Sequence, residues 1–172
     1  MKKVIYAILV MILSVPLSGY TVKGGVTYTV ETARKEAFAD VEYTLPKSII
    51  EANKVDPNYK DNMKAKAKGK NEFRDRAITY FDDGEYAIVY KKNRYYEYYY
   101  LSNGELEGIG KRIGLKVPVK VYKYNIKGEL LFIILDISQQ ESYLFEVSGK
   151  LDSYWIGDCC YDKNGNIVGR RH

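Results

Sequence analysis

The sequence predicts an α+β fold with an N-terminal helical region and an antiparallel β-meander built from about five hairpin repeats. A glycine motif recurs five times from residue 78 onward. Tyrosine is enriched, with 18 Tyr against 5 Phe and 1 Trp, and tyrosine favours the pleated, half-buried surface of a sheet. Only residues 31–76 have the composition of helices. Together these observations predict about eight to eleven strands.

Each copy of the motif has an aromatic residue four positions before a glycine and an apolar or aromatic residue two positions after it. The copies are Tyr80…Gly84-x-Tyr86, Tyr100…Gly104-x-Leu106, Tyr124…Gly128-x-Leu130, Phe145…Gly149-x-Leu151 and Tyr161…Gly165-x-Ile167. Successive glycines are 20, 24, 21 and 16 residues apart, which is enough for two strands and two turns. Each copy therefore predicts one hairpin, and adjacent hairpins can bury a common face.

The residue before each glycine indicates the kind of turn. It is Asp83, Asn103, Lys127, Ser148 and Asn164 in the five copies. Asp-Gly and Asn-Gly between apolar runs are typical of a type I′ turn, in which both central residues have positive φ. We therefore expect type I′ turns at the repeat glycines, with the aromatic and the apolar residue of each copy on the two arms of one hairpin.

The region before the repeats combines one short strand with helices. Residues 20–30 alternate valine and tyrosine with threonine, which predicts a strand. Thr29 or Thr32 could cap the helix that follows, and Gly69 is placed to end the last one. Three helices are expected, over residues 31–41, 46–52 and 56–68.

The first 19 residues predict a cleaved secretory signal of the bacterial type. Lys2 and Lys3 form a basic start, residues 4–13 are apolar throughout, and small residues follow where a signal peptidase would cut. The apolar run is shorter than the about 20 residues of a membrane-spanning helix, so no transmembrane segment is expected after cleavage. The protein is then secreted or periplasmic. The expected organisation is a signal peptide at 1–19, a strand and helical region at 20–76, and a repeat region at 77–172 that forms one domain with it.

Charge and cysteine content restrict the partners. The chain has 27 basic and 22 acidic residues, and removal of Lys2 and Lys3 leaves 25 basic residues and a net charge near +3. This net charge is too small to indicate a nucleic-acid partner. The two cysteines, Cys159 and Cys160, are adjacent. We interpret them as small apolar residues, with a disulfide-linked dimer or a strained vicinal disulfide as alternatives.

Two copies of the motif resemble known bacterial repeats. The stretches Tyr98–Gly108 (YYYLSNGELEG) and Cys160–Gly169 (CYDKNGNIVG) look like YwqK-type, MORN-like repeats, and residues 161–167 also have the shape of a YD repeat of RHS-type shells. The resemblance covers residues 78–169. It implies a meandering antiparallel sheet that serves as an interaction surface. YwqK-type proteins are described as antitoxins that neutralise a partner toxin.

The sequence contains no constellation that indicates an enzyme. The only histidine is His172, the last residue, so no catalytic base or metal ligand is assigned to it. The pairs Asp82-Asp83 and Glu105/Glu107 could act as the carboxylates of a glycoside hydrolase, but acidic residues beside turns serve solubility and turn geometry. No catalytic residue, cofactor or metal site is expected.

The run YYEYYY at residues 95–100 is the strongest candidate for a binding surface. Alternate residues of a strand face opposite sides, so one side carries Tyr96, Tyr98 and Tyr100 and the other carries Tyr95, Glu97 and Tyr99. One face can join the core. The other would present tyrosines to a protein or a sugar unless helices cover it.

We therefore expect an exported, non-enzymatic binding module with a tyrosine-rich sheet surface for a protein or, as second choice, a cell-envelope polysaccharide. A YwqK-like neutraliser of a toxin and a hydrolase that uses acidic residues are the alternatives. The basic segment 60–76 could meet an anionic polymer or lipid, although a solvated helix face explains it as well.

Overall fold

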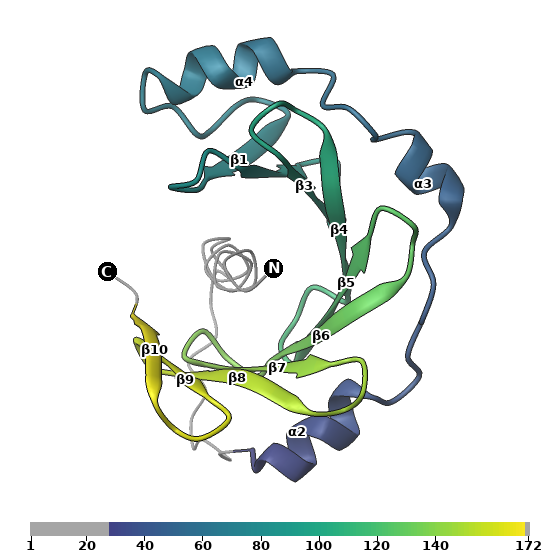
Figure 1. Cartoon of the computed structure of the whole chain (residues 1–172), viewed down its shortest axis with the longest axis vertical. Helices are drawn as coiled ribbons and strands as arrows, with labels where there is room; N and C mark the ends of the chain where they lie inside the picture. Colours follow the sequence, from purple (N-terminus) through teal and green to yellow (C-terminus); the bar gives the residue numbers. More distant parts are fainter. Residues whose placement is uncertain (1–27, 171–172) are drawn as a thin grey trace. The chain divides into compact units, whose positions relative to one another are not determined.

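The computed structural model describes residues 28–170, so the proposed signal at 1–19 and His172 lie outside the described part. Within this part, ten strands form one antiparallel sheet in chain order, and three helices precede them (Figure 1). The helices are α2 (Val30–Ala37), α3 (Lys47–Glu51) and α4 (Tyr59–Lys66). The strands are β1 (Arg76–Tyr80), β2 (Tyr86–Tyr90), β3 (Asn93–Tyr100), β4 (Leu106–Ile113), β5 (Val119–Asn125), β6 (Leu130–Asp136), β7 (Glu141–Glu146), β8 (Leu151–Ile156), β9 (Cys159–Asp162) and β10 (Ile167–Arg170).

The predicted antiparallel meander is confirmed, whereas the α+β description holds only in part. The helices have 8, 5 and 8 residues, so the described chain is mostly β. The last helix starts at Tyr59 rather than at Asp56. The Asp56 carboxylate accepts hydrogen bonds from the Asn58 N–H (2.8 Å) and the Asn62 side-chain amide (2.7 Å), which holds a turn ahead of the helix.

The strand predicted for residues 20–30 is not found in its described part. Thr29 instead caps α2, because its Oγ1 accepts a hydrogen bond from the Thr32 N–H at 3.1 Å. Val30 is already the first residue of the helix. The capping preference of threonine thus outweighs the alternation of residue types in this segment.

The chain divides into two compact units. The described part of the first, here called the α2 unit, comprises residues 28–41, 114–120 and 132–170 and contains α2 and β7–β10. The second, the α4 unit, comprises residues 42–113 and 121–131 and contains α3, α4 and β1–β4. Strands β5 and β6 contribute residues to both units.

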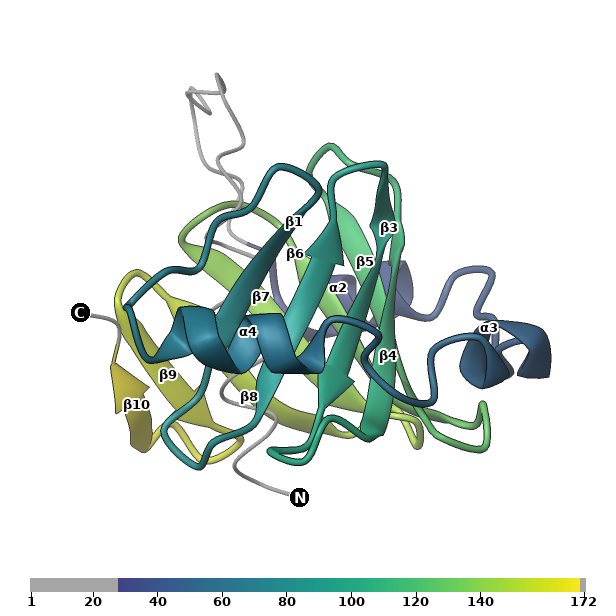
Figure 2. The same ribbon diagram turned by 90° about the horizontal axis from the view of Figure 1, so that it is seen from above.

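In the α4 unit, helix α4 crosses over β1 in both views (Figures 1 and 2). A buried polar network joins the two elements. The Arg76 guanidinium on β1 donates to Asn62 Oδ1 on α4 at 2.8 and 3.1 Å, and the Tyr86 hydroxyl on β2 donates to the Asp56 carboxylate at 2.7 Å. These partners satisfy the buried charges, so the helix is fixed over the sheet by hydrogen bonds as well as by apolar contact.

In the α2 unit, helix α2 lies against β7 (Figure 1). Ala33 and Ala37 are fully buried, and Phe38 at the end of the helix meets Phe145 edge-on with ring centroids 6.1 Å apart. Small residues on the helix let it approach the sheet closely, and the aromatic pair fills the end of the contact.

The five repeat glycines all lie in hairpin turns with φ between 82° and 93°. Their turns share one hydrogen-bond pattern. Each glycine N–H donates to the carbonyl three residues earlier, as Gly84 does to Phe81 at 3.1 Å, and the Phe81 N–H donates across the turn to the Glu85 carbonyl at 2.9 Å. This is a three-residue loop, a type I turn closed by a left-handed glycine.

The type I′ turn predicted for these positions is therefore wrong. Asp40 is the only non-glycine residue with positive φ in the described part of the chain, so the residue before each glycine has negative φ. Only the glycine needs the left-handed conformation, which explains why Lys127 and Ser148 are accepted beside it. The predicted pairing across each hairpin is found, for example Tyr80 opposite Tyr86 and Phe145 opposite Leu151.

We expect Gly128→Ala to destabilise the protein far more than Gly165→Ala. Both glycines have φ of 82°, but a Cβ on Gly128 would lie 2.6 Å from the Leu45 carbonyl oxygen, whereas the nearest atom to a Cβ on Gly165 is the Tyr154 hydroxyl at 4.0 Å. The left-handed alanine alone costs about 1 kcal/mol, and the backbone clash should raise the cost for Gly128 to about 3 kcal/mol. Urea unfolding of both variants measures the difference, and equal losses would contradict it.

Candidate functional site

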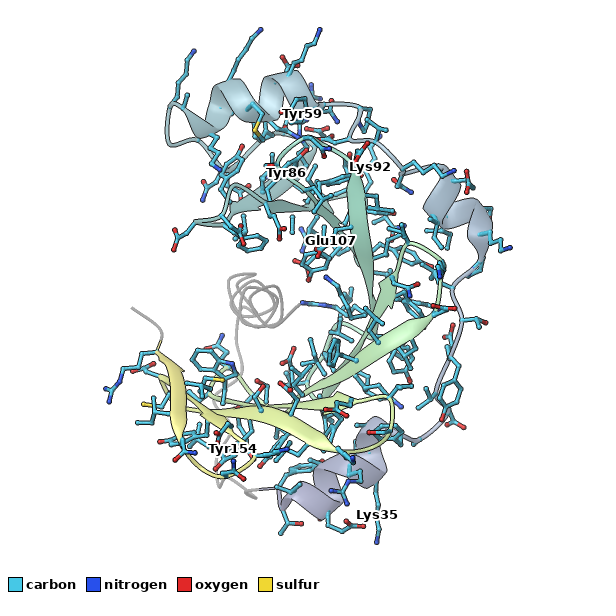
Figure 3. All side chains as sticks on the ribbon, in the orientation of Figure 1. Lys35, Tyr59, Tyr86, Lys92, Glu107 and Tyr154 are labelled. Atoms are coloured by element: carbon cyan, nitrogen blue, oxygen red, sulfur yellow. The ribbon has the colours of Figure 1, made fainter. Side chains whose placement is uncertain are left out.

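Strand β3 contains the tyrosine run that the sequence singles out. Pairing with β2 sets Tyr100 opposite Tyr86 and Tyr98 opposite Ile88. These residues face α4, and the Tyr86 and Tyr100 rings stack with centroids 5.5 Å apart. Tyr98 also contacts Tyr90 and Tyr96. This face of β3 is thus an aromatic core layer rather than a surface, and Figure 3 shows Tyr86 below α4, the helix that begins at Tyr59.

The opposite face of β3 carries a buried charge cluster formed by Glu97, Tyr99 and Lys123. The Tyr99 hydroxyl donates to the Glu97 carboxylate, and the Lys123 ammonium lies 3.4 Å from the centre of the Tyr99 ring. Lys123 is only 4 % exposed, and its Nζ has no hydrogen-bond partner among residues 28–170. Its charge is instead stabilised by the ring face and by the nearby carboxylates of Glu107, Glu97 and Glu85.

Burial shifts the titration of this cluster. It raises the pKa of the Glu97 carboxyl, although the hydrogen bond from Tyr99 opposes the shift. Burial lowers the pKa of Lys123 to about 8, whereas the three nearby carboxylates act to raise it. The Tyr99 pKa is well above its ordinary value because the ring is buried and lies next to Glu97. Tyr99 therefore stays neutral and Glu97 holds its proton more readily than an exposed glutamate.

Sequence reasoning did not find this cluster. A signal for it exists in β4, where Gly108 and Gly110 alternate within a strand. A Cβ on Gly108 would lie 3.1 Å from Lys123 Cε, and one on Gly110 would lie 3.5 Å from the Tyr99 ring. Glycine at these two positions makes room for the two large side chains above it, which is a known meaning of glycine inside a strand.

The predicted binding tyrosines therefore separate into two groups. Tyr98, Tyr99 and Tyr100 are buried, with Tyr99 only 1 % exposed, whereas Tyr95 is 47 % exposed and Tyr96 is half-buried. The expected stripe of exposed tyrosines is not formed, because the C-terminal half of β3 is covered on both faces. Only the start of the run is available to a partner.

A different row of aromatic side chains reaches the surface, in the α2 unit. Tyr143, Tyr154 and Tyr161 lie opposite one another on β7, β8 and β9, and we call them the aromatic row. Their rings stack with centroids 6.1 and 5.2 Å apart and planes within 20° of parallel, at 19° and 17°. The Tyr143 hydroxyl donates to the Tyr28 carbonyl at 2.8 Å, which anchors the buried end of the row.

The row becomes more exposed toward the edge of the sheet. Tyr143 is buried, Tyr154 and Tyr161 are half-buried, and Ile167, opposite Tyr161 on β10, is 48 % exposed. Ile156, on the same strand as Tyr154, is 43 % exposed. Figure 3 shows Tyr154 on the face of the sheet on which α2 lies, beside the helix rather than under it. The helix thus covers Phe145 but leaves this end of the face open.

The cysteines Cys159 and Cys160 lie on β9 and are not joined by a disulfide. Cys160 is fully buried opposite Trp155, and Cys159 is half-buried opposite Ile156. Neighbouring strand residues face opposite sides, so a bond between them would require β9 to break its pairing. A disulfide-linked dimer through one of the two cysteines stays a prediction.

The acidic pairs considered for hydrolysis lie at the repeat turns. Asp83 accepts a hydrogen bond from the Glu85 N–H at 3.1 Å, and Glu105 accepts one from the Asn103 side chain at 2.9 Å. Asp82 is exposed, and Glu107 is half-buried near Lys123. Two of the four carboxylates thus have a structural role in a turn.

No family model, curated protein or solved structure matches the chain. Among residues 28–170, no helix is long and apolar enough to cross a membrane.

We expect Tyr99→Ala to destabilise the protein by about 3 to 5 kcal/mol and Tyr95→Ala by less than about 0.5 kcal/mol. The two residues belong to the same tyrosine run on β3, but only Tyr99 is buried and bonded to Glu97. Urea unfolding measures both losses. Similar losses for the two variants would show that the tyrosine run is not divided as described.

We also expect Lys123 to make stability depend on pH. Its pKa is about 8 when folded and near 10.5 when unfolded, so between these values the unfolded chain binds more protons and the free energy of unfolding rises with pH. Between pH 7 and pH 10 the free energy of unfolding of the unmodified protein should increase by on the order of 3 kcal/mol more than that of the Lys123→Met variant. The exposed Lys127→Met is the control and should keep the rise. Urea titrations at each pH give the comparison, and an unchanged profile in Lys123→Met would contradict the burial of a charged lysine.

Proposed function

We propose that the chain is exported and acts as a non-enzymatic module that binds a protein partner through the open end of the aromatic row. The contact surface consists of Tyr154, Tyr161, Ile156 and Ile167. The observation that carries the proposal is the exposed fraction of the two isoleucines, 43 % and 48 %, beside two half-buried tyrosines on a face that α2 leaves open. Tyrosine and isoleucine grouped in this way have the composition of an interface centre.

The stacking of the rings favours a protein over a polysaccharide. A sugar ring binds to the open face of an aromatic ring, but the faces of Tyr154 and Tyr161 lie against each other at 5.2 Å. What the surface offers is ring edges, hydroxyl groups and aliphatic side chains. Such groups fit the side chains and backbone amides of another protein. The tyrosine hydroxyls can donate hydrogen bonds at the edge of the apolar contact.

Export is supported by the basic start, apolar run and small residues of the first 19 positions. Intact mass of the protein recovered from medium, periplasm and cytosol tests it. A species that begins near Tyr20 outside the cytosol is expected. A full-length chain confined to the cytosol would overturn export and favour the antitoxin-like alternative.

The contact surface can be tested by replacing Ile167 with a photo-crosslinking amino acid in producing cells. We expect irradiation to give a discrete protein adduct from this position. The same replacement at Ile126, which is 56 % exposed in another hairpin turn, is the control and should give none. Adding Tyr161→Ala to the Ile167 probe should reduce the adduct about tenfold or more, the effect of losing an interface tyrosine. Adducts of equal yield at both positions would refute the assignment of this surface.

A further inference from the structure

A second surface in the α4 unit has a high density of positive charge. The loop before β1 together with the first residue of that strand, residues 70–76, has three basic and two acidic residues, and the β2–β3 turn together with the start of β3, residues 91–94, has three basic residues and no acidic one. These eleven residues carry a net charge of +4, from six basic and two acidic side chains, whereas the whole chain carries +5.

The structure joins these two segments at one end of the sheet. The Lys91 N–H donates to the Asp75 carbonyl at 2.8 Å, and the Lys91 ammonium donates to the Phe73 carbonyl at 2.6 Å and pairs with Glu72 at 2.8 Å. The loop also pairs with the outer edge of β1 through a bridge between Glu72 and Ala77. Loop and turn therefore form one surface.

The internal ion pairs leave four cations available to a partner. Glu72 pairs with Lys91, and Asp75 pairs with Arg76 at 2.9 Å. Lys70, Arg74, Lys92 and Arg94 are exposed and form no ion pair with any described residue. We call these four residues the basic tip. Both acids of the surface are thus occupied, and the attraction of the basic tip for an anion is not cancelled locally.

Aromatic side chains accompany the charge. Tyr95 follows Arg94 and is 47 % exposed, and Phe73 is half-buried between Lys70 and Arg76, whose cations lie 4.8 and 4.1 Å from its ring centre. Tyrosine with lysine and arginine is the composition found at the headgroup level of a bilayer, where the ring is partly immersed and the cations meet phosphates.

We propose that the basic tip docks the protein on an anionic phospholipid surface. The cations project from two separate segments, a loop and a turn, and a broad charged surface can contact both at once. The attraction adds up over the cations and falls with ionic strength. This contact is independent of the aromatic row, so the test of one surface does not decide the other.

Vesicle sedimentation of the full chain tests the proposal. Vesicles with about a quarter phosphatidylglycerol in phosphatidylcholine are compared with phosphatidylcholine alone, which measures any binding by the apolar first residues. We expect binding to the anionic vesicles above that baseline, and its loss between about 0.05 M and about 0.5 M salt. Binding that depends neither on the lipid charge nor on the salt concentration would overturn the proposal.

Charge reversal locates the contact. Lys92→Glu with Arg94→Glu should lower the partition coefficient on anionic vesicles at least about tenfold. The control, Lys116→Glu with Lys127→Glu, changes the net charge equally at two other exposed positions and should leave most of the binding. Lys70→Glu with Arg74→Glu is the second test pair if the first is unstable. An equal loss in the control, or displacement by soluble polyphosphate at lower charge concentration than the lipid, would overturn the docking assignment.

Discussion

The left-handed glycine at the end of each three-residue loop is the constraint on which the rest of the structure depends. It closes the hairpin so that the residue four before it and the residue two after it lie opposite each other, as Tyr161 and Ile167 do. Within each hairpin this register sets two side chains of the motif opposite each other. In β1–β3 and in β7–β9, aromatic rings on neighbouring strands also contact one another and link the strands through their side chains.

What covers the aromatic side chains then decides whether they are core or surface. In the α4 unit the stacked Tyr86 and Tyr100 lie under a helix that is held by the Asp56–Tyr86 and Arg76–Asn62 hydrogen bonds. In the α2 unit, Phe38 at the end of α2 contacts Phe145, whereas Tyr154 and Tyr161 of the aromatic row are half-buried. One sheet thus contains both a core layer and an exposed surface, and because α2 and α4 have eight residues each, the placement of the helices rather than their length makes the difference.

The hairpins and the five turn positions could be predicted from the sequence, because glycine spacing and the alternation of residue types are local properties. The sequence was not sufficient for the tyrosine run, since burial of Tyr99 depends on Lys123, 24 positions away, and on Gly110 of the next strand. The turn type was missed for a related reason. Asn-Gly occurs in both kinds of turn, and only the φ of the residue before the glycine distinguishes them.

The residue before each repeat glycine can vary, and this limits what the resemblance to YwqK-type and YD repeats says about function. Asn103 and Asn164 contribute most to the resemblance, yet Lys127 and Ser148 occupy the same place in turns with the same hydrogen bonds. The Asn-Gly pairs therefore suit a tight turn without being required by it, and unrelated meanders of such hairpins can carry them. They carry information about the fold and little about the partner. The residues that distinguish this chain are those that the repeat does not require, namely the exposed Ile156 beside the aromatic row and the cations of the basic tip, and a function has to be argued from them.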